Sequence, residues 1–330
     1  MKDKTTLQKV INEIKESKSA VVMAHQNPDG DTLGSMLAVG ALLTNIGYKV
    51  DFVMSDPVPE IFKFLPYADQ IKNPEDKNIQ NKHDLSFSLD CGSLKRLGRA
   101  GKLFQEAKKS INIDHHISNE KFATINWIEA DATSTGQLVY WLAKKLNVKI
   151  SKEIATLLYV TLLTDTGCFA NSNTNAEALS WGAELIKLGA DSEAVYRKVF
   201  LEKPFKTIKI FGIGLKNLAV LENGDIGWTY VTKEEMNSLN ATGEDTEDIV
   251  DYVMRTRGVK LGVFFREHEN EIKVSLRSHT NLDVSEIAMS LGGGGHKRAA
   301  GINIKKPFSE VKELILGKVV EAYKKSNGKK

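Results

Sequence analysis

The fold of this chain is organised around the stretch His25-Gln26-Asn27-Pro28-Asp29-Gly30-Asp31. Residues 20–24 before it are apolar and have the length of a buried strand, and residues 32–43 after it read as a helix. Pro28 and Gly30 exclude regular secondary structure and predict a tight turn between the two. A histidine and two aspartates therefore follow a strand that we expect to be parallel, and open α/β sheets bind their ligands at this position.

Two interpretations of this stretch stay open when it is taken alone. Imidazole and carboxylate groups together form a ligand set for a divalent cation. The alternative is an ordinary loop in which an aspartate caps the helix that follows. The rest of the sequence has to decide between them.

Composition and charge narrow the class of protein. The chain has 330 residues, of which 42% are hydrophobic and 26% charged, so it is an ordinary globular protein with room for two domains. Its 45 basic and 42 acidic residues give a formal charge of +3. Such a weak field argues against charge-driven binding of long duplex nucleic acid and favours short or small phosphorylated substrates.

The cellular context is predicted from what the sequence lacks. Cys91 and Cys168 are the only cysteines, so no disulfide framework is expected. No signal-peptide core and no apolar run of membrane length occur, so we expect no membrane partner and a cytoplasmic location. A homodimer is left open.

Strands and helices alternate through the first 200 residues, which predicts an α/β fold with a doubly wound, mostly parallel sheet. The pattern then changes: residues 205–221 read as one long helix, and two apolar runs flanking Glu269-Asn270 read as an antiparallel hairpin. We therefore expect a second, smaller α+β domain. The predicted division is a first domain at 1–200, a connecting helix at 201–221 and a second domain at 222–330.

Acidic and histidine side chains recur where predicted strands or an apolar helix end. The parallel strands of one sheet all end at the same edge, so we expect these groups to converge. Like charges held that close raise one another's pKa and destabilise the fold. Two divalent ions would balance four carboxylates, which favours a two-metal site over a set of unrelated turn residues. The four carboxylates are those of Asp29, Asp31, Asp90 and Asp165.

The spacing now becomes recognisable. His25-x3-Asp29-x-Asp31, followed by Asp90, by Asp114-His115-His116 and by Asp165, resembles the four motifs of the DHH phosphoesterases. The run from Gly292 to Gly301, Gly-Gly-Gly-Gly-His-x2-Ala-Ala-Gly, looks like the signature of the DHHA1 domain. Together the motifs cover nearly the whole chain. Its size and two-domain layout look most like the nanoRNase type of this family.

The resemblance implies a ligand set for two Mn²⁺ ions, with Mg²⁺ or Co²⁺ as substitutes. One ion would take His25 and Asp29, the other Asp31, His115 and Asp165, and Asp90 would link the two. Oxygen-rich ligands without thiolates agree with manganese rather than zinc. Catalytic roles are implied for two further residues. Asp114 would orient the histidines, and His116 would touch the phosphoryl oxygen or assist the leaving group; a packed structural histidine is the alternative for the latter.

The glycine run suggests how a substrate is held. Glycines let backbone N–H groups approach a phosphate closely, although a flexible turn beside solvated cations explains the run equally well when it is taken alone. The resemblance favours phosphate binding, with Arg277 and His296 as its main donors. The family's usual lysine after Arg-Ser is His279 here, which weakens a role for that position. The implied substrate-binding residues are Ser275, Arg277, Gly293, Gly294, Gly295, His296 and Arg298.

The resemblance implies a manganese-dependent phosphohydrolase. It would degrade short oligoribonucleotides to mononucleotides and dephosphorylate 3′-phosphoadenosine 5′-phosphate, with the first domain holding the metals and the second the far end of the substrate. One alternative is a phosphodiesterase for linear or cyclic dinucleotides such as pApA or cyclic-di-AMP. The other is a non-catalytic nucleotide-binding regulator, against which the intact set of ligand residues argues. Strand polarity, preferred length and base stay open.

Overall fold

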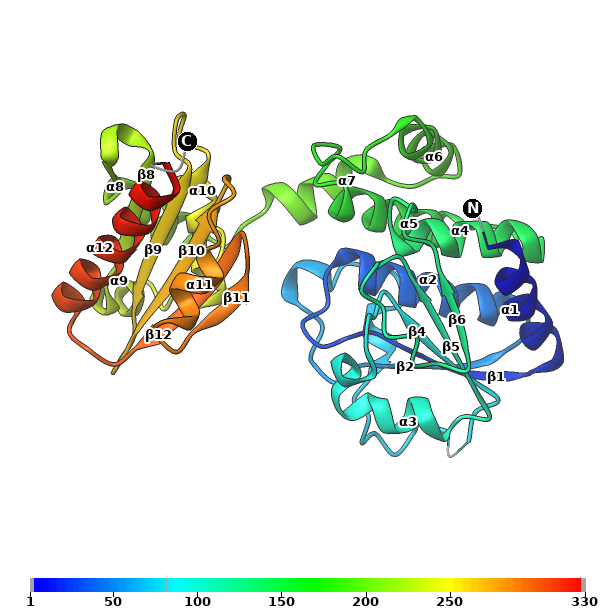
Figure 1. Ribbon diagram of the computed structural model, residues 1–330. Coiled ribbons are helices and arrows are strands. Elements are labelled where there is room, and N and C mark those ends of the chain that lie inside the picture. The colour runs from blue at the N-terminus through cyan, green and yellow to red at the C-terminus, as the bar shows by residue number, and fades with distance from the viewer. Residues whose placement is uncertain (1–2, 81, 328–330) are drawn as a thin grey trace. The chain divides into compact units, whose positions relative to one another are not determined.

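The computed structural model describes residues 3–80 and 82–327, and the ends of the two predicted domains at 1, 2 and 328–330 lie outside these residues. The chain forms two compact units that divide between Glu202 and Lys203 (Figure 1). None of the helices in the described ranges combines the length and the apolar character needed to cross a membrane.

The first unit contains a parallel sheet and the helices around it. Its strands are β1 Ser19–Met23, β2 Lys49–Val53, β3 Ile71–Lys72, β4 Leu85–Leu89, β5 Lys109–Asp114 and β6 Ile125–Ile128. Its helices are α1 Lys4–Glu16, α2 Gly30–Asn45, α3 Gly101–Glu106, α4 Thr135–Leu146, α5 Lys152–Asp165, α6 Ala176–Lys187 and α7 Ser192–Tyr196. A 3₁₀ segment, η3, spans Leu94–Ala100, and a π-helical turn follows α7 at Arg197–Leu201.

The strand order β3-β2-β1-β4-β5-β6, with every pair parallel, confirms the predicted doubly wound sheet. The chain order reverses between β1 and β4, and a ligand crevice forms at such a switch point, beyond the carboxyl ends of the strands. The stretch from His25 to Asp31 leaves β1 at this point, and Asp90 leaves β4 beside it. The topology alone therefore brings the two predicted ligand segments together.

Helices cover both faces of this sheet, which explains why β1 reads as a continuous apolar run. Val22 of β1 packs with α1, α2, α4 and α5 in the larger core. Its neighbours Val21 and Met23 point to the opposite face, where they pack with Leu97 of η3 and Phe104 of α3. Helix α3 and helix α2 accordingly lie on opposite sides of the sheet in Figure 1.

The second unit is built on a mixed sheet of order β11-β12-β10-β9-β8-β7, in which only β8 and β9 pair in parallel among the described strands. Its strands are β7 Ala219–Leu221, β8 Ile226–Val231, β9 Leu261–Glu267, β10 Ile272–Ser278, β11 Gly294–His296 and β12 Ala299–Ile304. Its helices are α8 Phe205–Lys216, α9 Lys233–Ser238, α10 Ile249–Met254, α11 Val284–Met289 and α12 Phe308–Asn327. The predicted α+β unit and its β9–β10 hairpin are confirmed.

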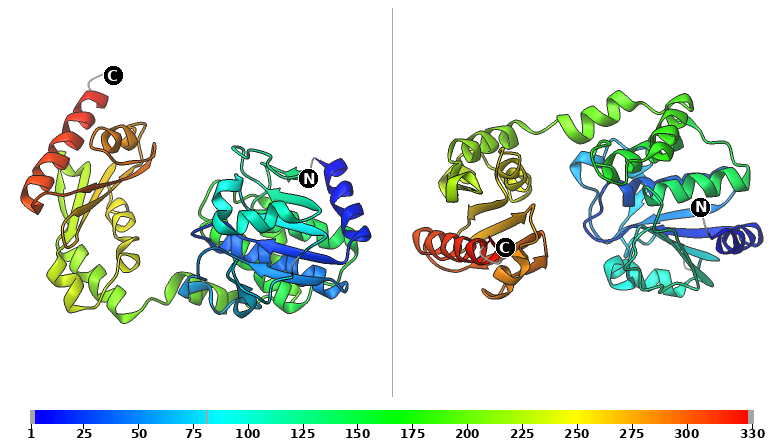
Figure 2. Two further views of the ribbon diagram at one scale, coloured as in Figure 1. Left: turned by 90° about the horizontal axis from the view of Figure 1, so that it is seen from below. Right: turned by 45° about the horizontal axis from the view of Figure 1, so that its top comes forward.

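The two faces of the second sheet differ. One face packs with α11 and α12 in a continuous apolar core (Figure 2). On the other face, α8 and α10 pack on Phe264 of β9. Alternate residues of β10 on this second face, Lys273, Ser275 and Arg277, are only half-buried. Their cross-strand partners on β12 are Asn303, Gly301 and Ala299, so this part of the face carries small and polar side chains.

One predicted element was wrong in extent. The single helix predicted at 205–221 ends at Lys216, where the Asn217 side chain donates to the carbonyl of Tyr230, and strand β7 follows it. The role of this segment as a connector between domains stays a prediction. The glycine run is also more ordered than a turn, since Gly294–His296 pairs with β12 as an edge strand.

Candidate metal centre

The acidic and histidine residues predicted from the sequence gather beyond the carboxyl ends of β1, β4 and β5. Three groups have ligand atoms that all lie within 4.8 Å of one another. They are His25 with Asp29 and Asp90, then Asp31 with His115 and Asp165, and then Asp90 with His115 and His116. Asp90 belongs to two of these groups and lies between the others. All eight predicted metal-site and catalytic residues, Asp114 included, therefore occupy one region.

Asp31 is held by the first turn of α4. Its carboxylate accepts from the backbone N–H groups of Thr135 at 2.8 Å and Gly136 at 3.1 Å, and from the hydroxyl of Ser35. A Cβ at Gly136 would lie 1.9 Å from the hydroxyl oxygen of Thr161, so only glycine fits there. The anion at this helix N-terminus is thus the protein's own carboxylate. Burial and the neighbouring aspartates raise the pKa of Asp31 well above its ordinary value.

Thr32 marks the centre of the first ligand group. Its hydroxyl oxygen lies 2.7 Å from His25 Nε2, 2.9 Å from Asp29 Oδ1 and 2.9 Å from Asp90 Oδ2. His25 Nδ1 donates to the carbonyl of Gln26 at 2.7 Å, which leaves the lone pair on Nε2. Three acceptors thus surround one hydroxyl, which has a single proton to give. Other donors complete the set, since Arg96 Nη2 lies 3.0 Å from His25 Nε2 and the Thr32 N–H donates to Asp29. The two carboxylates nevertheless hold like charges close together, and a cation bound by His25, Asp29 and Asp90 would balance them, so these residues fit a metal ion.

Asp29 combines both interpretations of the opening stretch. Its Oδ1 accepts from the backbone N–H of Thr32 at 2.9 Å and so caps α2. The same side chain belongs to the ligand group around His25. Capping a helix and approaching a cation are compatible, because a carboxylate has lone pairs for both.

The second ligand group centres on His115. Its Nε2 lies 3.8 Å from Asp31, 3.6 Å from Asp90 and 3.6 Å from Asp165. The other ring nitrogen faces the carbonyl of Ala132 at 3.3 Å, which favours the tautomer with Nε2 unprotonated. Asn173 donates to the backbone carbonyl of Asp165, and this contact steadies the end of α5.

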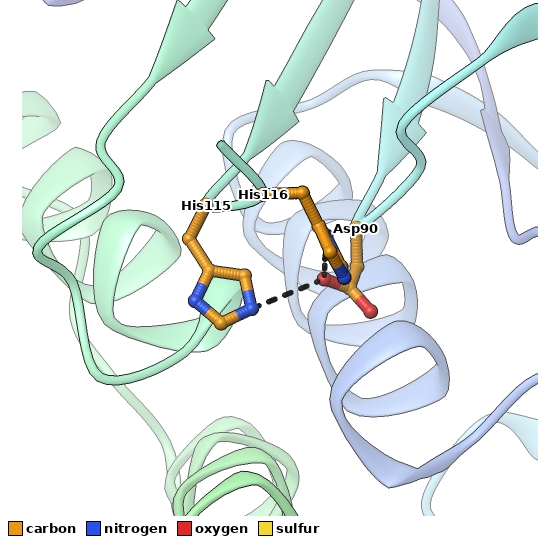
Figure 3. Close-up of side chains that lie close together, drawn as sticks. All are labelled: Asp90, His115 and His116. Carbon is orange, nitrogen blue, oxygen red and sulfur yellow. Dashed lines mark ion pairs between the residues drawn. The ribbon is translucent and has the colours of Figure 1, made fainter. Parts of the chain in front are cut away.

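Asp90 occupies the most constrained position of the site. It is 2% exposed and its φ is +53°, a left-handed conformation that a non-glycine residue adopts at some cost. Figure 3 shows His115 and His116 directed at the same oxygen of Asp90, at 3.6 and 3.5 Å. Burial, with Asp29 as a second cause, raises the pKa of Asp90 to about 7. The site therefore concentrates negative charge that only protons or cations can balance.

His116 is oriented by a short chain of polar contacts. Asp114 is fully buried and accepts from His116 Nδ1 at 2.7 Å. Asn119 donates to the other oxygen of Asp114 and also to the carbonyl of Cys91. The hydrogen bond to Asp114 raises the pKa of His116 to about 9. With Nδ1 fixed in this way and the side chain 41% exposed, Nε2 is the ring nitrogen available to a substrate.

Arg96 is a site residue that the sequence interpretation missed. Its Nη2 lies 3.0 Å from His25 Nε2 and 3.1 Å from Nδ1, so the guanidinium rests against the imidazole. The backbone carbonyl of Arg96 accepts from Gln26 N–H at 2.8 Å, which ties η3 to the loop after β1. The available signal was its position six residues after Asp90, in the segment that follows the same strand.

The residues predicted to hold the substrate all belong to the second unit. Arg277 Nε donates to Asp251 at 3.1 Å, and Ser275 lies two residues before it on the same side of β10. Gly294, Gly295 and His296 form the exposed edge strand β11. Arg298 is exposed, and a Cβ at Gly293 would lie 2.3 Å from the carbonyl oxygen of Gly301.

Comparison with known proteins agrees with this fold and site. Residues 19–162 match the DHH family, N-terminal domain, and residues 228–326 match the DHHA1 domain. The chain belongs to the DHH family and is a phosphoesterase, as its motifs predicted. The two matched ranges fall on either side of the division between the compact units.

Two relatives and one solved structure place it within this family. A bifunctional oligoribonuclease and PAP phosphatase NrnA from Thermus thermophilus is 32% identical, over 86% of this chain and 83% of the relative. The protein of the same name from Bacillus subtilis is 24% identical, over 86% and 88%. The crystal structure of an exopolyphosphatase-related protein from Bacteroides fragilis superposes with a TM-score of 0.88 and 27% identity, covering 98% of each chain.

Proposed function

We propose that the chain is a manganese-dependent phosphohydrolase that degrades short oligoribonucleotides to mononucleotides and also dephosphorylates 3′-phosphoadenosine 5′-phosphate. The names of the two NrnA relatives support both activities. The observation that carries the proposal is the convergence of four carboxylates and three imidazoles around Thr32 and Asp90. A cytoplasmic location stays a prediction.

The proposed ligand set follows the observed groups. His25 and Asp29 would hold one ion, Asp31, His115 and Asp165 the other, and Asp90 both. Two divalent ions supply Lewis-acid stabilisation of the charge that develops during in-line displacement at phosphorus. Oxygen and imidazole donors without thiolates favour Mn²⁺, and Mg²⁺ would be a weaker substitute because it takes imidazole ligands less readily.

The chain's own cations would then act on the substrate. His116 keeps one proton on Nδ1 through Asp114 and can give a second, on Nε2, to the leaving oxygen. Arg96 places a permanent positive charge beside His25 and would stabilise a phosphoryl oxygen there. Asp114 and Asn119 act as positioning residues, because they fix the ring that carries the proton.

In this proposal the second unit grips the far end of the substrate. Arg277 can bind a phosphate in bidentate fashion once its ion pair with Asp251 is broken. Breaking this pair costs little free energy because both side chains are partly exposed. His296 and the backbone of Gly293, Gly294 and Gly295 would add donors. We expect efficiency to fall steeply as the RNA grows beyond a few nucleotides, because a chain with a formal charge of +3 offers few phosphate contacts to a long strand.

A substrate panel tests the function. The purified chain is stripped with chelator and supplied with Mn²⁺, Mg²⁺ or Co²⁺ in turn. It is then assayed on RNAs of increasing length, on 3′-phosphoadenosine 5′-phosphate, on pApA and on cyclic-di-AMP, with products separated by chromatography. We expect mononucleotides from short RNA and phosphate from the bisphosphate, with Mn²⁺ the best ion. Activity confined to pApA or the cyclic dinucleotide would replace the proposal with the phosphodiesterase alternative, and binding without turnover would indicate a regulator.

A further inference from the structure

The second unit contains a cavity that includes Ser275 and Arg277 of the proposed grip and extends to Arg266 and Lys273, which the grip does not use. Its volume is about 190 Å³, and it lies on the face of the sheet that carries α8 and α10. The polar residues that line it are Thr246, Glu247, Arg266, Lys273, Ser275 and Arg277. Three of these are cations and one is a carboxylate, so the cavity carries an excess of positive charge.

Two of the cations face each other directly. Arg266 of β9 and Lys273 of β10 are cross-strand partners in the antiparallel pair. Like charges in this position destabilise a sheet. Among the residues that the structure describes, neither forms an ion pair with a carboxylate within 4.0 Å, whereas Arg277 pairs with Asp251. Glu247 is the one carboxylate among the described residues that line the cavity, so its three cations leave an excess of positive charge that an anion from outside would balance.

The Arg266 side chain is held in place by hydrogen bonds, but not all of its donors have a partner. Its Nη1 donates to the carbonyl of Gly243 at 2.7 Å and to the hydroxyl of Thr246 at 2.9 Å. A Cβ at residue 243 would lie 2.8 Å from that nitrogen, so the glycine makes room for the guanidinium. Its Nε is buried and has no hydrogen-bond partner in the described chain. Burial lowers the pKa of Arg266, while Glu247 acts in the opposite direction.

We propose that this cavity is an anion site that binds a phosphate group of a nucleotide, with Arg266 and Lys273 as its cations. Ser275 contributes a hydroxyl to the same wall, and the two cations provide donors that a phosphate accepts well. The site does not depend on the metal centre. It rests on the proposed function only for the identity of the anion, which would be a terminal phosphate of a short RNA.

Binding without metal tests the site directly. The full chain, labelled with ¹⁵N and kept in chelator, is titrated with inorganic phosphate, AMP and adenosine while the Arg266 Nε–H signal is followed by NMR. Arg266→Lys identifies this signal because it removes it. We expect phosphate and AMP to shift the signal and adenosine to leave it unchanged. A larger effect of AMP would assign the site to a nucleotide phosphate rather than to the free ion.

Charge variants distinguish phosphate binding in the cavity from a general effect of positive charge on the protein surface. Lys273→Gln should weaken the binding of AMP by about tenfold, the size of one lost charge-assisted hydrogen bond. The matched control is Lys318→Gln, on α12, which packs on the opposite face of the sheet and does not line the cavity. Equal affinity of Lys273→Gln and the unaltered chain, or the absence of any phosphate-dependent shift, would overturn the site.

Kinetics connect the site to the substrate. In the presence of Mn²⁺, kcat/KM is measured for a dinucleotide with a terminal phosphate, at the 5′ or the 3′ end, and for the same dinucleotide without it. The quantity of interest is the ratio of the first value to the second. Lys273→Gln should lower this ratio about tenfold, and Lys318→Gln should not. An unchanged ratio would show that the cavity does not bind the terminal phosphate of the substrate. Failure of the proposed function is distinguishable, because the unaltered chain would then hydrolyse none of the dinucleotides while the metal-free titration still reports on the cavity.

Discussion

In the first unit, four aspartates and three histidines meet at the carboxyl edge of a parallel sheet, whereas in the second unit arginine, lysine and histidine gather on a sheet face that is only partly covered. The first region carries an excess of carboxylates, and the second carries an excess of cations. Arg96 offsets part of the negative charge of the first region, and Asp251 and Glu247 offset part of the positive charge of the second, so each region keeps an excess that a partner of opposite charge would balance. Metal ions would balance the first region, and a phosphate group would balance the second.

The difference also separates two ways of positioning charge. The carboxylates are placed by strand ends and held by buried contacts, such as the first turn of α4 on Asp31. The cations are placed by the alternation of side chains along β9 and β10, and several remain half-buried. Substitutions in the first region should accordingly abolish chemistry, and those in the second should alter affinity and selectivity.

The largest expected effect is at Asp90. Asp90→Asn keeps the size of the side chain but removes the charge that the two ligand groups share, so kcat should fall by about 10³-fold or more, as expected when several kcal/mol of charge stabilisation is lost. The measurement is phosphate release with saturating Mn²⁺, alongside circular dichroism to establish folding. In the chelated protein the same change should raise Tm, because it removes one of several like charges. Near-normal turnover with Mn²⁺ would break the two-metal interpretation of the first region.

A smaller loss is expected at Arg96, whose permanent positive charge lies among the carboxylates. Arg96→Gln should lower kcat by about 10²-fold, the usual effect of removing one donor aimed at developing charge. The affinity for Mn²⁺, measured by calorimetry, should not weaken, because the positive charge removed would repel the ions. Lys95→Gln is the matched control on the same 3₁₀ segment and should behave like the unaltered chain. If both variants lost activity equally, Arg96 would contribute only to the general field.

How far the sequence could predict this site depends on the range of the contacts. Residues at strand ends, such as Asp90 and His115, could be predicted because a local apolar run followed by an acid or histidine suffices. The helix start at Thr135 could be predicted as a donor to an anion, but its partner could not, since the contact with Asp31 spans 104 residues and depends on the docking of α4. Arg96 was missed for the same reason: a single arginine in a loop has no pattern of its own.

The same difference between local patterns and long-range contacts applies to the fold. The parallel sheet and the β9–β10 hairpin were predicted because their strands are apolar and flanked by turn residues. Strands β11 and β12 were missed, since glycine and alanine have low strand propensity and the pairing of Gly294 with Gly301 is a tertiary contact. The cavity at Arg266 and Lys273 needs the register of the hairpin, which periodicity alone does not give.

A moderate effect is expected at Arg277 in the second region. Arg277→Ala should raise KM for dinucleotides and trinucleotides by about tenfold and leave the affinity for Mn²⁺ intact, because it removes one charge-assisted grip away from the metal centre. Asp251→Asn, which frees Arg277 from its ion pair, should lower KM slightly. The measurement is kcat/KM over a ladder of RNAs from the dinucleotide upward. An unaffected Arg277→Ala enzyme would refute the grip, and equal efficiency on short and long RNA would refute the length preference.

The smallest effect concerns a carboxylate of the second unit that, unlike those of the metal centre, is fully compensated. Asp245 is 6% exposed; it pairs with Lys206 at 2.8 Å and accepts from Thr207 and from the backbone N–H of Thr242. These contacts outweigh the opposing effect of burial and lower its pKa to about 2, from an ordinary value of 3.8. Because the folded pKa lies below the unfolded one, the contribution to stability is complete above about pH 4 and is lost as the pH falls toward 2.

Its size follows from the shift in pKa, reduced because Lys206 is partly exposed, and is about 1 to 2 kcal/mol. Hydrogen exchange of the Thr242 amide, which donates to Asp245, reports this locally. Its protection should decrease between pH 4 and pH 2.5, after correction for the intrinsic exchange rate, whereas Asp245→Asn should begin less protected and show little change over the same range. If both proteins lost protection in parallel, the acid sensitivity of the second unit would arise from other carboxylates. The contrast between compensated and uncompensated charge would then be supported by the metal centre alone.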